Sequence, residues 1–167
     1  MAVYVELVEL AEIEMPMQFL TRVIPSFLVS WLLTFSLASL FHSQYVVNQL
    51  VNIGVEVKFA DRLQLTQEDW LGLLPTYGAI IAIAFLIAFP VTAWLAKKWD
   101  KYRTQLYVAG GITAFIIVLV AIESIMNINI IAGARGWGFY AQLLAGAIGG
   151  WVFAKISSVL GTSKSNA

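Results

Sequence analysis

Five polar residues near one end of the long apolar stretches are of types that bind anions or exchange protons. They are His42, Glu123, Asn127, Arg135 and Gln142. Glu123 is the only acidic residue within the hydrophobic part of a predicted span, and Arg135 is the nearest opposite charge in the sequence. An ion close to lipid is costly unless it is paired or hydrated, so we expect Glu123 and Arg135 to be neighbours.

The predicted pairing of Glu123 with Arg135 has three interpretations. The first is a structural clamp that ties the last two apolar stretches together. The second is a ligand site, in which the guanidinium fork of Arg135 holds a phosphate or carboxylate. In the third, each side chain reaches outside water independently.

The other polar residues extend the candidate site. His42 is predicted at the same level, where a lone histidine forms interfacial hydrogen bonds or, alternatively, senses protons. Gln142 and Asn127 can face the same point. If the chain folds as an up-and-down helical bundle, these residues, with Glu123 and Arg135, line an outward-facing polar pocket.

The composition indicates that lipid is the solvent for most of the chain. Hydrophobic residues make up 60% and charged residues 12% of the sequence, and the mean hydropathy is +0.81. About a quarter of the residues in a soluble domain are charged. We therefore predict an all-α integral membrane protein, with residues 1–167 forming a single membrane domain.

The apolar stretches predict a four-transmembrane-helix bundle. A helix needs about 20 apolar residues to cross the hydrocarbon core. The predicted spans are residues 23–42, 67–96, 104–126 and 138–160.

The segment between the first two spans, residues 43–66, is predicted as an outer loop. The helical pattern of span one runs into this segment and ends near Gly54. The residues that follow alternate between polar and apolar types, which favours an extended loop or a very short hairpin. Thr66 and Asp69 approximate a capping box, so the second helix is predicted to start at about Gln67.

The acidic N-terminal segment, residues 1–16, is predicted to form a short amphipathic helix that Pro16 separates from the first span. Three of its glutamates, Glu6, Glu9 and Glu12, recur at a spacing of three. The segment is interpreted as a solvated end of the chain. The alternative is a docking element for a partner or for the protein's own basic loop.

Prolines and small residues predict where the spans bend and touch. Pro75 and Pro90 each remove a backbone donor from span two, so we expect a kink near one or both. Span four carries two overlapping pairs of small residues, Ala145 with Gly149 and Gly146 with Gly150. Such pairs let two helix backbones approach closely, either within the chain or in a dimer.

Two tryptophans, Trp31 and Trp151, fall at membrane depth in the predicted spans. A buried indole N–H needs a hydrogen-bond partner. We therefore expect both side chains to face protein.

The distribution of cations predicts the orientation. Four spans place both termini and the loop at 97–103 on one side of the membrane. That side holds seven of the ten Lys and Arg residues: Arg22, Lys97, Lys98, Lys101, Arg103, Lys155 and Lys164. Short cationic loops resist translocation, so we predict a multi-pass protein of a bacterial inner membrane with both termini in the cytoplasm.

These features favour a non-enzymatic accessory or scaffold subunit that acts through helix–helix contacts in the bilayer, in a homo-oligomer or a larger membrane complex. The alternative is a binder or carrier of a lipid or small anionic solute at the outward-facing pocket. The sequence has no cysteine and one histidine, so neither a catalytic constellation, a metal nor a cofactor is predicted. Acidic and basic residues balance at ten each, which argues against a nucleic-acid partner.

Overall fold

The computed structural model describes the backbone of residues 2–126 and 136–162 and the side chains of residues 20–124 and 136–160. Within these ranges the structure is helical and contains no strand. Its helices are α1 (Ala2–Asn52), α2 (Phe59–Leu73), α3 (Ala79–Lys98), α4 (Arg103–Met126) and α5 (Trp137–Thr162). A π-helical turn, Leu74–Gly78, joins α2 to α3, and a short 3-10 turn, Asp100–Tyr102, precedes α4.

Four of these helical segments are long and apolar enough to cross a membrane, which confirms the predicted multi-pass, all-helical class. They are Leu20–Asn52, Phe59–Lys98, Asp100–Ser124 and Trp137–Leu160. The predicted spans coincide with them to within two residues or lie inside them. Both the predicted spans and these helical segments meet the length and hydropathy that a membrane crossing requires.

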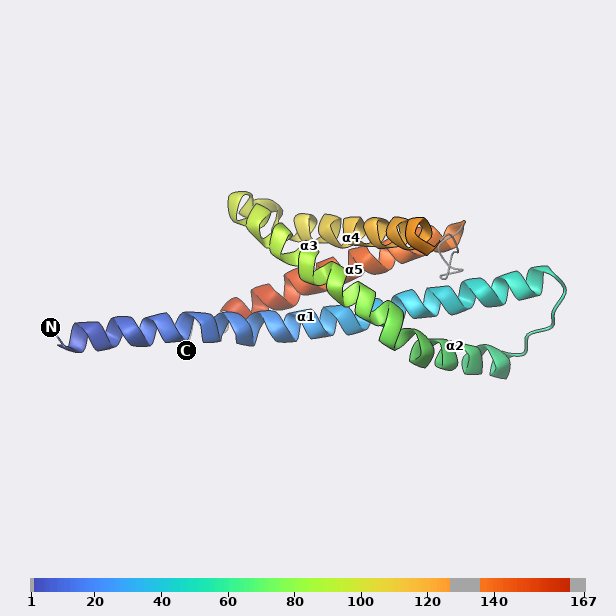
Figure 1. The fold of residues 1–167 in the computed structure, drawn as a ribbon, viewed down its shortest axis with the longest axis horizontal. Coiled ribbons are helices and arrows are strands. Elements are labelled where there is room, and N and C mark those ends of the chain that lie inside the picture. The colour runs from blue at the N-terminus through green and yellow to red at the C-terminus, as the bar shows by residue number, and fades with distance from the viewer. Residues whose placement is uncertain (1, 127–135, 163–167) are drawn as a thin grey trace.

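The four long apolar segments, of which α2 and α3 together form one, alternate in direction along one long axis (Figure 1). Both ends of the chain and the connection between α3 and α4 lie at one end of the bundle, and the α1–α2 connection lies at the other. α5 packs against both α1 and α4, and α3 packs against α4, whereas α1 and α3 touch at few points. The bundle is therefore closed around α5 and loose between α1 and α3.

Aromatic side chains fill the interior of the bundle. The Phe89 ring stacks on Phe85 and lies against Phe153, with ring centroids 4.4 Å apart in both pairs. Phe35 and Phe115 are also buried. Because lipid tails are as apolar as these rings, close packing rather than escape from water holds the helices together.

Glycines bring α5 close to its neighbours. A Cβ atom on Gly150 would overlap the carbonyl oxygen of Tyr107, and one on Gly146 would lie 2.6 Å from the carbonyl oxygen of Gly111. Gly149 faces α1 instead, where its carbonyl accepts a 2.6 Å hydrogen bond from the Ser30 hydroxyl. Ala145 is completely buried. The overlapping small-residue pairs therefore lie in contacts within the chain.

The predicted separation of the N-terminal segment is wrong, because α1 continues as one helix of 51 residues through Pro16. The φ angle of proline suits a helix, and the cost of an internal proline, about 3 kcal/mol, is local. A long helix can therefore carry one without ending.

The predicted outer loop at 43–66 is too long, since only residues 53–58 between α1 and α2 are outside a helix, whereas the predicted end of the first helix near Gly54 is confirmed. Gly54, with a φ of 88°, takes the left-handed conformation that ends α1. Of the alternating residues that follow the turn, residues 55–58 stay outside a helix, whereas those from Phe59 onward form the first half of α2.

The start of α2 at Phe59, not Gln67, has a local cause. The Asp61 carboxylate accepts a 3.2 Å hydrogen bond from the backbone N–H of Lys58 and so satisfies a donor at the helix N-terminus. Thr66 lies inside the helix, where its hydroxyl donates to the Arg62 carbonyl at 2.8 Å. Thr66 and Asp69, which were predicted to form a capping box, therefore have other hydrogen-bond partners: the Arg62 carbonyl for Thr66 and the Ser43 hydroxyl for Asp69.

The π-helical turn surrounds Pro75, while α3 continues as α-helix through Pro90. The ribbon changes direction where α2 passes into α3 (Figure 1).

The indole N–H of Trp31 donates to the Gly78 carbonyl at 2.7 Å, so this tryptophan faces protein as predicted. Trp151 is 49% exposed, and the same prediction for it is wrong.

Candidate functional site

The structure describes the side chains of three of the five residues predicted to line an outer pocket, and only one of the three is exposed. Glu123 is exposed on α4, whereas His42 and Gln142 are buried in the bundle. Asn127 and Arg135 lie outside the described residues, and so does the predicted contact between Glu123 and Arg135.

Gln142 crosslinks three elements in the core. Its Oε1 accepts a 2.9 Å hydrogen bond from the Tyr77 hydroxyl, in the π-helical turn. Its Nε2 donates to the Ala38 carbonyl of α1, also at 2.9 Å. Both ends of a fully buried amide are satisfied, so Gln142 has a structural position rather than one facing an outer pocket.

Polar side chains also join α1 to α2. The Ser43 hydroxyl donates to the Asp69 carboxylate at 2.7 Å, and the Trp70 indole N–H donates to the Ser36 hydroxyl at 3.1 Å. The contact between Ser43 and Asp69 was not predicted, because Asp69 was expected to cap a helix.

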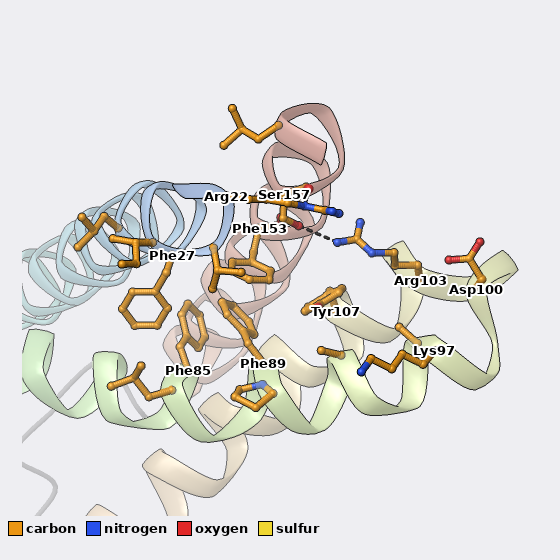
Figure 2. A pocket seen from close by; sticks show the side chains of 18 residues that line it. Arg22, Phe27, Phe85, Phe89, Lys97, Asp100, Arg103, Tyr107, Phe153 and Ser157 are labelled. Atoms are coloured by element: carbon orange, nitrogen blue, oxygen red, sulfur yellow. Dashed lines mark hydrogen bonds between the residues drawn. The ribbon is translucent and has the colours of Figure 1, made fainter. Parts of the chain in front are cut away.

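A cavity of about 650 Å³ lies between α1 and α3, toward the end of the bundle that carries both termini (Figure 2). We call it the α1–α3 cavity. Its volume falls within the range of about 300–1,000 Å³ that is usual for small-molecule sites. Its walls are mainly apolar and include Val23, Phe27, Phe85, Phe89, Phe153 and Leu160.

Aromatic rings form the protein side of the cavity. Phe85, Phe89 and Phe153 are all buried, and Tyr107 lies against Phe153 with ring centroids 5.0 Å apart. The Phe27 ring meets Phe89 edge-on from α1 at 6.4 Å. These contacts fix the rings in place, so the cavity has a preformed apolar wall.

Two arginines converge at one end of the α1–α3 cavity. Arg103, on α4, donates from Nη1 to the Ala154 carbonyl at 2.8 Å and from Nη2 to the Ser157 hydroxyl at 2.7 Å. Arg22, on α1, donates from Nε to the Ser157 carbonyl. Figure 2 shows the two guanidinium groups directed toward each other at Ser157, beside the aromatic rings. We call this pair the arginine clasp.

The arginine clasp concentrates positive charge. The acceptors described for Arg22 and Arg103 are neutral oxygens near the C-terminal end of α5, where carbonyl groups carry partial negative charge. Lys97 lines the same end of the cavity, and so does one carboxylate, that of the exposed Asp100. Three cations and one anion therefore surround this end, which makes it attractive to an anion.

From sequence, Arg22 and Arg103 were expected only to mark the cytoplasmic side of the membrane. One available signal was their type, because arginine at a span boundary offers a planar fork that lysine lacks. The proximity of the two residues could not be read from the sequence, since it depends on how α1 and α4 pack around α5.

No protein-family model, curated protein or solved structure matches this chain. Within the described part of the chain, no group of three or more His, Asp or Glu side chains is placed to hold a metal ion. What the site can do chemically follows from its own geometry: it can bind a molecule with an anionic end and an apolar body.

Proposed function

We propose that this protein binds an anionic amphiphile, a molecule with a charged head and an apolar tail, in the α1–α3 cavity. The observation that carries the proposal is the convergence of Arg22 and Arg103 at one end of an aromatic-walled cavity. The ligand class is the one that the sequence offered as the alternative to a scaffold subunit, a lipid or a small anionic solute. The site lies at the opposite end of the bundle from the pocket expected there.

Both halves of such a ligand find a suitable environment. Guanidinium groups form charge-assisted, often bidentate hydrogen bonds with phosphate and carboxylate groups. The arginine clasp presents two of them where lipid, rather than water, surrounds much of the protein. The rings of Phe85, Phe89 and Phe153 offer an apolar surface to the tail.

A purely structural role for the arginine clasp makes a different prediction. If Arg22 and Arg103 only tie α1 and α4 to the end of α5, replacing them with glutamine lowers stability and changes nothing else. If they hold an anion, the replacement removes the ligand while the bundle remains folded. Stability and ligand content must therefore be measured on the same variants.

Native mass spectrometry after gentle detergent extraction provides that test. We expect the wild-type protein to carry a co-purifying anionic amphiphile and the Arg22→Gln/Arg103→Gln variant to lose it. Lys101→Gln, which removes an exposed cation from the same end of the bundle, is the matched control and should retain the adduct. An unliganded wild-type protein, or an equal adduct on the folded double variant, would refute the proposal.

We place the arginine clasp on the cytoplasmic side of a bacterial inner membrane. Lys97, Lys98 and Lys101 lie at the end of α3 and in the α3–α4 connection, at the same end of the bundle as the arginine clasp. Short cationic segments are retained in the cytoplasm. Anionic lipids give the cytoplasmic leaflet a negative surface potential, so suitable ligands are concentrated there.

A second function, that of an accessory or scaffold subunit, is favoured by exposed apolar residues where α1 turns into α2. We call this turn, residues 53–59, the tip of the α1–α2 hairpin. The Tyr45 and Trp137 rings lie 5.4 Å apart and mark the level of an interfacial aromatic belt. Ile53 and Phe59 lie beyond that level on the hairpin and are 76% and 75% exposed. Apolar side chains outside the bilayer are suited to a protein partner.

The partner that this tip fits best is a second copy of the chain. Two acidic and two basic residues alternate around the turn, Glu56, Lys58, Asp61 and Arg62. A neutral, alternating pattern can complement itself in a two-fold interface.

The chain has no cysteine, so Phe59→Cys introduces a unique thiol. We expect it to form a disulfide-linked dimer in membranes, whereas Ile87→Cys on α3 should not. A monomeric Phe59→Cys protein under oxidising conditions would exclude this interface.

A further inference from the structure

We infer that the ligand of the α1–α3 cavity has a single hydrocarbon chain ending in a phosphate or carboxylate, and that it enters sideways from the bilayer between α1 and α3. This inference rests on the proposed function and adds the number of chains, the orientation and the route of access.

The volume of the cavity favours one chain. A site of about 650 Å³ suits a ligand in the drug-sized range. A single chain with a compact head is of that size. The second chain of a phospholipid would have to remain outside, where it gains no contact with the rings of Phe85, Phe89 and Phe153.

The orientation of the site matches that of a lipid in its leaflet. The arginine clasp lies toward the end of the bundle, whereas Phe27 and Phe85 lie deeper along α1 and α3. A head held by Arg22 and Arg103 would therefore place its tail toward the middle of the membrane. A molecule already in the adjacent leaflet has this orientation and can enter without turning over.

The route of access follows from how α1 and α3 are joined. Trp31, on α1, hydrogen-bonds to Gly78 at the π-helical turn that precedes α3. Beyond that junction the two helices touch at few points, and the cavity lies between them. Leu28 on α1 and Leu86 on α3 line the cavity and are also exposed at its edge. These side chains would contact lipid in a membrane, so the gap between them opens into the bilayer.

The head must be small and anionic. The Ser157 hydroxyl and carbonyl already accept from Arg103 and Arg22, which holds the two guanidinium groups close together. A guanidinium has five N–H donors, and these contacts use only part of that capacity. A phosphate or carboxylate oxygen can therefore bridge the clasp while Ser157 keeps it assembled.

Photo-crosslinking in nanodiscs of phosphatidylcholine tests the inference. The probes are hexadecyl phosphate and hexadecanoic acid, each with a diazirine near the end of the chain, and a two-chain phosphatidic acid with the same group. We expect both single-chain probes to label peptides that contain Phe27 or Phe85. Unlabelled hexadecyl phosphate should compete at least tenfold more effectively than the two-chain lipid, and inorganic phosphate should not compete.

The outcomes separate this inference from the function on which it rests. If the two-chain lipid labels Phe27 and Phe85 as well as the single-chain probes do, the inference is overturned and the proposed function stands. If every probe labels only lipid-facing positions such as Ile83, Ile117 and Val120, both are overturned. Labelling by one of the two single-chain probes alone would support the inference and identify the head group.

Bulky side chains at the gap test the route. Leu28→Trp and Leu86→Trp alter exposed positions, so the bundle should still fold. We expect either change to slow labelling by hexadecyl phosphate at least fivefold. Ile83→Trp, on the same helix as Leu86 but not lining the cavity, is the control and should label at the wild-type rate. Wild-type rates in both gap variants would overturn lateral access.

Discussion

Gln142 shows how one amide can fix three elements of a membrane bundle relative to one another. Its side chain lies on α5, accepts from the Tyr77 hydroxyl and donates to the Ala38 carbonyl. In the apolar interior these groups have no water as an alternative partner. The position of the π-helical turn against α1 and α5 is therefore set by hydrogen bonds as well as by packing.

Gln142→Leu should lower the free energy of unfolding by about 1–3 kcal/mol, because it leaves the Tyr77 hydroxyl buried without its acceptor. Adding Tyr77→Phe removes that stranded donor. The double variant should therefore be less destabilised than the sum of the single variants, as measured by reversible unfolding in mixed micelles. Strict additivity would show that the contact contributes nothing.

Gly150 tests the close approach of α5 to α4. Gly150→Ala places a Cβ atom where the Tyr107 carbonyl oxygen lies, so the helices must move apart. We expect a loss of about 1–3 kcal/mol in the unfolding free energy, as for other overpacked sites. Gly72→Ala is the matched control, because nothing lies within 4 Å of the added atom. It should be neutral or stabilise by up to about 1 kcal/mol, and equal losses in the two variants would contradict the close contact.

Helix α2 depends on polar contacts with α1, the helix that precedes it in the chain. Its N-terminal residues have an alternating polarity, and Thr66 and Asp69 imitate a helix start in the sequence. In the structure both contact α1: Gln44 Nε2 donates to the Thr66 hydroxyl at 3.3 Å, and Ser43 donates to Asp69. Contacts with α1 thus occupy the two side chains that imitate a helix start, while the Asp61 carboxylate caps the true first turn.

The start of α2 can be tested by hydrogen exchange at the first turn of the helix. Asp61→Ala removes the carboxylate that accepts from the Lys58 N–H and complements the helix dipole, an effect of about 0.3–1 kcal/mol. Amide exchange near residues 59–62 should accelerate by a corresponding few-fold. Thr66→Ala should leave that turn unchanged. If exchange became faster in Thr66→Ala but not in Asp61→Ala, the result would support the predicted helix start at Gln67 instead.

The sequence predicted the crossing segments well because each depends on its own hydropathy. It failed at Pro16, where a proline was taken to end a helix that continues. It also failed at 43–66, where local polarity suggested a loop. In both places the outcome depends on the rest of a long helix or on a neighbouring helix, which a local pattern does not contain.

At the scale of the whole molecule, the arrangement of four helices explains why the cavity was not predicted. Arg22 and Arg103 are far apart in the sequence, and α5 brings them together by offering oxygens to both. The cavity exists because α1 and α3 each pack on other helices and leave a gap between them. The expected outer pocket was inferred from residues at one level, without knowledge of which face each presents.

The alternating helices also make a prediction about topology. The α1–α2 connection, which contains Glu56, and the α3–α4 connection, which contains Lys101, lie at opposite ends of the bundle (Figure 1). In the cysteine-free chain, Glu56→Cys should react with a membrane-impermeant maleimide in intact cells, and Lys101→Cys should react only after permeabilisation. The reverse pattern would place the arginine clasp outside the cell, and labelling of both in intact cells would contradict four crossings.

Ligand binding in the α1–α3 cavity is tested by equilibrium binding of radiolabelled hexadecyl phosphate to the purified protein in an uncharged detergent. Loss of charge-assisted hydrogen bonds, each contributing about 1.5–3 kcal/mol, should weaken binding at least tenfold in Arg22→Gln/Arg103→Gln. We predict saturable binding of one molecule per wild-type chain, the same in Lys101→Gln. Uptake that rises without saturation, or an affinity unchanged in the folded double variant, would contradict the account.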